Sequence, residues 1–259
     1  MDLWQEHGDL ICSKSPEVLN RLRPAAASSL IEQGLPTLND EEYRHTDFEK
    51  ILGPDYGVNV GRVRIDVNPS ETFRCDVPML STSLFLIVND AFAETSGCRN
   101  MLPDGVDVMS LAAYARNNPD FVASYYGKLA DMANPIVALD TLLCQDGVVI
   151  RVGKGVKVEP AIQIVNIFKN SSPLLAARRV LVVMEEESEA KILFCDHTQT
   201  PDVGFCSLQV VEVFAGVGSR LDLYDLEEST RQTARLSSLW LRQDAGSEAV
   251  AYTHQTLPT

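Results

Sequence analysis

Two cysteines and a histidine in the second half of the chain are the residues best suited to hold a metal ion or a cluster. Cys195 and His197 are two positions apart, and Cys206 follows after a short gap. On a strand, side chains two apart face the same side, and a thiolate beside an imidazole can bind iron, zinc or an iron–sulfur cluster. Structural sites of this kind use four ligands, and no fourth ligand stands at motif spacing. We therefore expect Cys195 to be a small core residue and His197 to lie in a loop just past the strand.

Four acidic residues further along could act as the acid/base carboxylates of a β-helix enzyme that acts on glycans. They are Asp222, Asp225, Glu227 and Glu228. Asp222 and Asp225 are an odd number of positions apart, so on a regular strand they face opposite sides. We therefore expect exposed acids at the edge of a coil, and we expect the three glutamates at 185–187 to form a solvated turn.

The remaining motifs are weaker as chemistry. Gly153 and Gly155, like Gly216 and Gly218, form G-x-G fragments that lack the third glycine and the following helix of a phosphate-binding loop. They fit turns between coils. No G-x-S-x-G nucleophile motif occurs. The sequence therefore assigns no catalytic, cofactor-binding or metal-ligating residue.

These candidates fall in a region of repeated strands. The predicted strands are 148–152, 162–168, 179–184, 190–195, 208–214, 220–226 and 234–241. Two strands recur about every 29 residues with no helix-length pattern between them, which predicts a parallel β-helix of stacked coils, each too small to bury a core alone. An antiparallel sandwich is the alternative, but no Asn-Gly hairpin turn stands between the runs.

The first half is predicted to be mainly helical. Ser15 as N-cap and Pro16 at the first position predict one helix. Pro24 cannot continue that helix and opens a second one, which Gly34 ends. An N-x-x-E pattern that starts at Asn39 resembles a capping box in front of a third helix. Further elements are predicted at 84–88 (a buried strand), at 111–117 (a helix capped by Ser110), from Pro119 (a helix) and at 135–144 (a buried helix).

Charge and hydropathy exclude several classes of function. The 259 residues carry 36 acidic and 22 basic side chains, a formal net charge of −14. No basic stripe is present, which argues against binding to nucleic acid or to an anionic membrane surface. No apolar run reaches the roughly 18 residues of a membrane span, and the N-terminus lacks the pattern of a secretory signal. The six cysteines form no C-x-x-C pair, so we expect reduced thiols and a cytoplasmic location.

Several motifs, in a shared order, resemble the SufB/SufD family. They are G-L-P-T at 34–37, E-E-Y-R-H-T-D at 41–47, A-L-D-T-L-L-C-Q-D-G-V-V-I-R-V at 138–152 and E-P-A-I-Q-I at 159–164. The resemblance runs from about residue 15 to about residue 250. Within the family the chain is more similar to the SufD branch, because it has no cysteine-rich N-terminal insertion. Asp140 stands where the family pattern has Asn, and Gly153 stands where it has Pro.

The resemblance implies a non-catalytic scaffold for iron–sulfur cluster assembly. It implies a right-handed parallel β-helix flanked by helical regions, and partnership with a SufB-like paralogue and a SufC-like ATPase. The iron–sulfur cluster belongs to the full complex. We carry over no functional residue, because the family's interface and docking residues lie beyond the part that this chain matches.

The resemblance also suggests how the chain is organised. We expect an N-terminal helical domain at 1–83, a mixed connector at 84–147, a partial β-helix at 148–248 and a non-native tail at 249–259. This division treats the chain as truncated. A coil that is left open has unpaired backbone groups, so we expect self-association through that end. A glycan-active β-helix enzyme and a self-associating structural solenoid are the alternative functions.

Overall fold

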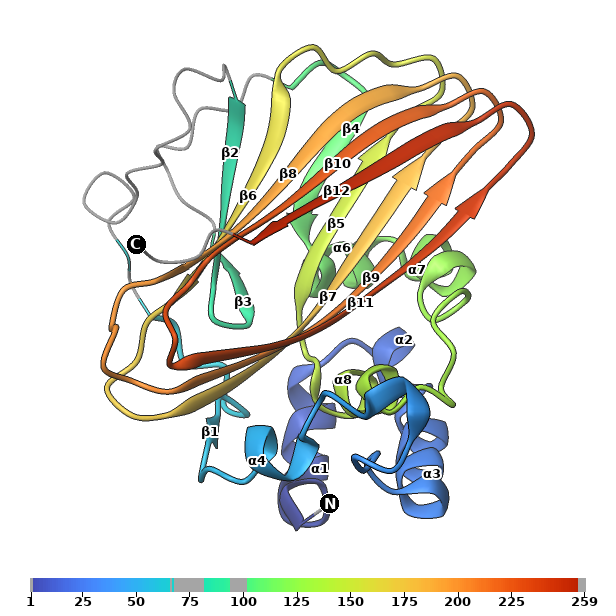
Figure 1. Ribbon diagram of the computed structural model, residues 1–259. Helices are drawn as coiled ribbons and strands as arrows, with labels where there is room; N and C mark the ends of the chain where they lie inside the picture. Colours follow the sequence, from blue (N-terminus) through green and yellow to red (C-terminus); the bar gives the residue numbers. More distant parts are fainter. Residues whose placement is uncertain (1, 66, 68–81, 94–101, 256–259) are drawn as a thin grey trace.

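Consecutive strands in the second half alternate between two sheets. In the computed structural model, which describes residues 2–65, 67, 82–93 and 102–255, one sheet has the order β11-β9-β7-β5-β4, with β1 paired to β7. The other has the order β12-β10-β8-β6-β2-β3. All pairs are parallel except β4 with β5 and β2 with β3. Figure 1 shows the two stacks of strands facing each other. This is a solenoid of about three turns.

The elements have the following bounds. The helices are α1 (Asp2–Lys14), α2 (Glu17–Asn20), α3 (Arg23–Gln33), the 3-10 helix η1 (Glu41–Tyr43), α4 (Phe48–Leu52), α6 (Leu111–Asn117), α7 (Pro119–Tyr125) and α8 (Pro135–Leu143). The strands are β1 (Gly57–Val58), β2 (Thr82–Val88), β3 (Ala91–Ala93), β4 (Val106–Ser110), β5 (Gly147–Val152), β6 (Ala161–Phe168), β7 (Leu174–Met184), β8 (Glu189–Thr198), β9 (Phe205–Ala215), β10 (Arg220–Glu228), β11 (Thr233–Gln243) and β12 (Glu248–Gln255).

The space between the two sheets is filled by alternate side chains. Val180 on β7 is in register with Val211 on β9, and Ile192 on β8 with Ile162 on β6. All four belong to one apolar cluster. Neighbouring residues on each strand point outward. The prediction of an N-terminal helical region followed by a parallel β-helix is confirmed.

The turns at one edge of the solenoid stack on each other. Gly155, Glu187, Gly218 and Gly246 occupy the corresponding place in successive turns, with φ of 69°, 57°, 66° and 69°. Glu187 N–H donates to the carbonyl of Val217, in the next turn, at 2.8 Å. Gly218 N–H likewise donates to the carbonyl of Ala245, one turn further on, at 3.1 Å. The prediction that the G-x-G fragments and the glutamates at 185–187 form turns is confirmed.

Helices cover the outer face of the sheet that contains β7 and β9. Figure 1 shows α6, α7 and α8 along this side, and α1 and α3 beside α8. The outward residues Ala177, Leu208 and Val210 pack in one cluster with Val137 of α8, and Leu181 packs in a second cluster with α6 and α7. The sheet therefore has one apolar face in the solenoid core and one apolar face under helices.

Four predicted helix starts are confirmed and two are wrong. Helices α7 and α8 begin at Pro119 and Pro135 as predicted. Pro24 lies in the first turn of α3, and the Ser110 hydroxyl accepts a hydrogen bond from the third residue of α6. Ser15 does not cap α2, whose N-cap is Pro16. The helix predicted after Asn39 is replaced by η1 and by α4, and Asp47 caps α4 through its side chain. Helix α1 was not predicted, since its apolar residues are few.

The strand rhythm extends beyond the predicted end of the β-helix. Strand β12 pairs in parallel with β10 from Glu248 to Gln255. The expectation that the rhythm stops at residue 248 is therefore wrong. Residues 256–259 lie outside the described residues. No helix in the described part of the chain is long and apolar enough to cross a membrane.

Gly147, the first residue of β5, gives a test of the fold. A Cβ atom at this position would lie 1.8 Å from the carbonyl oxygen of Arg179. We expect Gly147→Ala to lower the free energy of unfolding by at least about 3 kcal/mol, because backbone atoms of β5 and β7 would have to separate. Chemical denaturation followed by circular dichroism measures this.

A matched glycine variant separates this effect from ordinary turn strain. Gly155 has φ of 69° but no atom within 4 Å of its Cβ position. Gly155→Ala should cost only about 1 kcal/mol, the strain of a left-handed residue. Equal losses for the two variants would contradict the close approach at Gly147.

Candidate functional site where the helical region joins the solenoid

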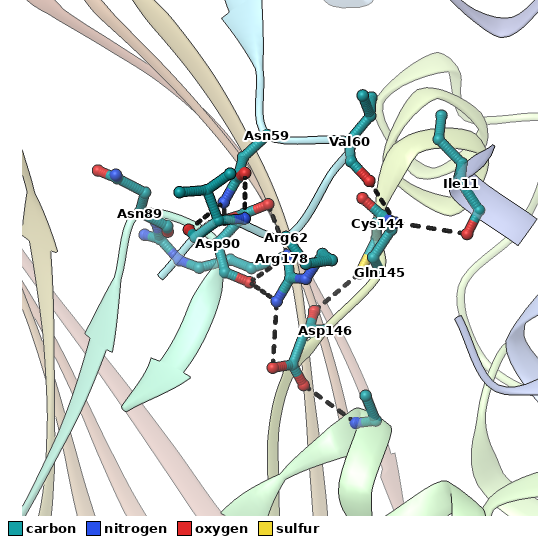
Figure 2. Close-up of polar contacts among 12 residues, drawn as sticks. Ile11, Asn59, Val60, Arg62, Asn89, Asp90, Cys144, Gln145, Asp146 and Arg178 are labelled. Carbon is teal, nitrogen blue, oxygen red and sulfur yellow. Dashed lines mark hydrogen bonds and ion pairs between the residues drawn. The ribbon is translucent and has the colours of Figure 1, made fainter. Parts of the chain in front are cut away.

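The segment that leads from α8 into β5 lies at the junction between the helical region and the solenoid. It carries the Asp146 carboxylate, which accepts hydrogen bonds from several segments. Asp146 is buried, and its Oδ1 accepts hydrogen bonds from the Ser110 hydroxyl at 2.8 Å and from Ala112 N–H at 3.0 Å. Its Oδ2 accepts from Phe92 N–H and from Arg62 Nη2, both at 3.3 Å. Figure 2 shows the contact of Arg62 with the Asp146 carboxylate. One carboxylate thus joins β3, the start of α6 and the segment that follows β1.

Arg62 extends the network to the hairpin between β2 and β3. Its Nη1 lies 2.7 Å from Asp90 Oδ2. Asn59 Nδ2 contacts the other carboxylate oxygen of Asp90 at 3.5 Å. Burial raises the pKa of Asp90, and the Arg62 charge opposes that shift. Asn89, with φ of 57°, forms the turn with Asp90, and its side chain exchanges two hydrogen bonds with the backbone of Lys169.

Gln145 and Cys144 connect the same segment to the N-terminal helices. Gln145 Nε2 donates to the carbonyls of Ile11, in α1, and Val60, each at 3.3 Å. The Cys144 thiol lies 2.9 Å from the carbonyl of Asp146, and burial raises the pKa of that thiol. The thiol is therefore protonated and structural at neutral pH.

Arg23, in the first turn of α3, closes the C-terminal end of α8. Its guanidinium is fully buried and donates to the carbonyls of Thr141, Leu142 and Cys144. The last carbonyls of a helix have no partner within the helix and carry partial negative charge. A buried cation that donates to three such carbonyls satisfies them and fixes α3 against α8.

Arg179, on β7, anchors the helices to the outer face of the sheet. It is fully buried between Asp140 of α8, at 3.0 Å, and Glu212 of β9, at 3.4 Å, and it lies over the ring of Tyr126 at 4.8 Å. Glu212 also accepts three backbone N–H groups of the loop 127–130, at 2.8–3.1 Å. The sheet, α8 and this loop therefore meet at one guanidinium.

The two carboxylates beside Arg179 have different surroundings. Glu212 accepts three backbone N–H groups and forms an ion pair with Arg179. Asp140 Oδ2, in contrast, has no hydrogen-bond partner although it is buried. Burial raises the pKa of Asp140 to about 7, against the opposing effect of Arg179, and the nearby Glu212 raises it further. Asp140 is thus the carboxylate that takes up a proton near neutral pH.

The structure separates the three candidate metal ligands. Cys195 and His197 both lie on β8, on its outward face, so the expected shared face is confirmed, but His197 is within the strand and not in a loop. Cys206 lies on β9 of the other sheet and packs under helices, where burial raises the pKa of its thiol to about 12. The described residues contain no group of three side chains that could hold a metal ion.

The acidic candidates are also dispersed. Strand alternation places Asp222 and Asp225 on opposite faces, as predicted. Asp225 and Glu227 point into the solenoid and pair with Arg235 at 2.7 and 3.5 Å. The expectation that these two are exposed acids is therefore wrong, because the partly buried Arg235 pairs with both. Glu228 lies 3.3 Å from His197 on the outer face.

The residues that do assemble were missed by sequence reasoning. Arg23, Arg62 and Asp146 come from segments far apart in the chain, with 84 positions between Arg62 and Asp146. One signal was available, because Asn89-Asp90 between apolar runs is typical of a hairpin turn. Nothing local marked its partners.

Comparison with known proteins identifies the region that contains this junction. The family described as SufBD protein, N-terminal region, matches residues 1–164, which is more than half of the chain. The chain belongs to the SufB/SufD family. The match spans the helical region and the start of the solenoid, including Arg23, Arg62 and Asp146. SufB/SufD proteins act in iron–sulfur cluster assembly by the SUF system. No curated protein sequence matches the chain.

The junction gives a pH-dependent prediction at Asp140. A carboxyl pKa of about 7 in the folded protein, against 3.8 as the ordinary value, means that the folded state holds this proton more tightly. The stabilisation is fully present below pH 3.8 and is lost as pH rises through about 7, with a slope of about 1.4 kcal/mol per pH unit for one proton. We expect Asp140→Asn, which mimics the neutral acid, to be more stable than the wild type by a margin that grows from pH 5 and levels off above about pH 7.

Denaturation midpoints of the wild type and of Asp140→Asn between pH 5 and pH 8 test this. Asp120→Asn, at an exposed position of α7, is the matched control and should run parallel to the wild type. A lower stability of Asp140→Asn at pH 8 would show that Asp140 is ionised and needed as a charge beside Arg179.

Proposed function

We propose that this chain is a SufD-like scaffold without chemistry of its own, which acts with a SufB-like paralogue and a SufC-like ATPase in the cytoplasm. The family match over residues 1–164 carries the proposal. The iron–sulfur cluster is built on the complex of these proteins, and this chain contributes a shaped surface. Specific pairing distinguishes this function from that of a structural solenoid alone.

Charged side chains hold separate segments of the described chain together, which supports a scaffold function. Arg23, Arg62 and Arg179 each hold two or more segments together through buried contacts. Such contacts define geometry more than they add stability. A protein that binds partners over a large surface needs its helical region held at a constant position on the solenoid, and these arginines supply that.

Co-purification tests the proposed partnership. We expect the tagged full chain, co-expressed with SufB-like and SufC-like proteins from the same source, to retain both on affinity resin. Cys195→Ala and Cys206→Ala should retain them equally, because the two thiols lie on opposite outer faces and hold no common ion in this proposal. Quantitative staining and mass spectrometry measure the stoichiometry.

Two outcomes would contradict the proposal. Loss of both partners from the wild-type chain would leave the family membership as a statement about fold alone. Release of reducing sugar from acidic or neutral polysaccharides, abolished by Asp225→Asn, would support the glycan-active alternative instead. The pairing of Asp225 with Arg235 at 2.7 Å favours a structural role for that carboxylate.

A self-associating solenoid is the second candidate, favoured by one observation. In the described part of the chain, β11 and β12 each pair on one edge only. Leu239 and Leu241 on β11 are 43% and 41% exposed, although this face is buried on the preceding strands. An open pair of edges with an exposed apolar end is a template for another chain.

Light scattering tests this second candidate. We expect the 259-residue chain to form oligomers as its concentration rises, and we expect Leu239→Lys with Leu241→Lys to reduce them, because charge opposes burial of the open end. Val217→Lys, at an exposed turn position (49% exposed) on the coil before this end, is the control. A monodisperse wild-type monomer at high concentration would contradict self-association.

A further inference from the structure

A cavity of about 430 Å³ lies beside the junction. Arg62 and Asp146, which Figure 2 shows in contact with each other, are among its polar lining residues. Its walls come from the segment after β1, the β2–β3 hairpin and α6, and about half of the lining residues are apolar. Val88, Phe92 and Ala113 are among the wall residues. The volume is within the range of sites that bind small organic molecules.

Three basic side chains surround this cavity. Lys14, at the end of α1, Arg64 and Arg116, at the end of α6, are all exposed lining residues. Arg116 Nη2 donates to the backbone carbonyl of Lys14 at 3.2 Å, which places these two side by side. Within the described residues none of the three forms an ion pair, whereas Arg62 pairs with two carboxylates. Their charges are therefore available to a ligand.

The charge balance around the cavity is opposite to that of the whole chain. The chain carries a net charge of −14. Among the described lining residues Asp146 is the one acid, and it already accepts from Arg62 and from N–H and hydroxyl donors. Low-dielectric walls concentrate the field of unpaired charges in a cleft. The cavity thus presents positive potential at its rim and apolar surface within.

We propose that this cavity binds an organic anion that joins a carboxylate or phosphate head group to an apolar body. The head group contacts Arg64, Arg116 and Lys14, where a guanidinium can hold two oxygens of either group. The apolar body lies against Val88, Phe92 and Ala113. This site is separate from partner binding in the proposed scaffold function and stands whether or not that function holds.

Isothermal titration calorimetry on the full chain, with matched ligands below their micelle concentrations, tests the proposal. Decanoate and decyl phosphate carry the two head groups, decanol has the same body without charge, and decyltrimethylammonium reverses the charge. We expect at least one anion to bind and both other ligands to bind at least about tenfold more weakly, the equivalent of one favourable charge contact. The stronger anion identifies the preferred head group.

Variants separate the rim from the interior. Arg64→Glu with Arg116→Glu changes exposed residues only, so the chain should fold, and anion affinity should fall by about tenfold or more. Ala113→Phe fills the cavity and should remove binding while every charge stays in place. Arg21→Glu, at an exposed position outside the cavity, should leave affinity unchanged.

Four results would overturn the proposal, three of which concern the ligands and the rim. These are the absence of binding by both anions, equal binding of the cationic ligand, and full affinity in the Arg64→Glu, Arg116→Glu chain. Binding that survives in a folded Ala113→Phe chain would place the ligand elsewhere on the surface and would overturn it as well.

Discussion

The guanidinium of Arg179 is the contact on which the arrangement of the helical region depends. A buried cation is costly unless it is paired and hydrogen-bonded. Arg179 therefore requires Asp140 from α8 and Glu212 from β9 at the same time. Glu212 in turn fixes the loop 127–130 through three N–H donors. Removal of the charged partner of such a group costs about 3–5 kcal/mol, so the loop that Glu212 holds cannot leave the sheet separately.

Polar side chains also satisfy the backbone groups at both ends of α8. Arg23 satisfies its last carbonyls, and Asn134 caps its first turn by accepting two backbone N–H groups. The helix is thus held by directed polar contacts as well as by the apolar cluster beneath it. Directed contacts matter here because apolar packing on a regular sheet tolerates sliding, whereas a hydrogen bond to a buried charge does not.

The Asp146 carboxylate also fixes the segments that line the proposed binding cavity. The carboxylate collects the hairpin, α6 and the segment after β1 at one point, and these same segments leave the cavity beside it. Arg62 neutralises the Asp146 carboxylate in the lining of the cavity, while the basic side chains at the rim can still contact a ligand. A scaffold that is rigid at this point can present both a partner surface and a small binding site without moving either.

The local sequence predicts the repeating part of the fold, whereas it does not predict the contacts at the junction. Strand alternation, the spacing of about 29 residues and the turn glycines predict the solenoid, because each coil repeats the same local pattern. Pro24 and Ser110 predict helix starts for the same reason. The partners of Arg62, Arg179 and Asp146 could not be predicted. A buried charge can pair with an opposite charge from any segment of the chain. Only the tertiary structure decides which distant segment lies beside it. The same limit applies to Cys195 and Cys206, which are close in sequence but lie on separate sheets.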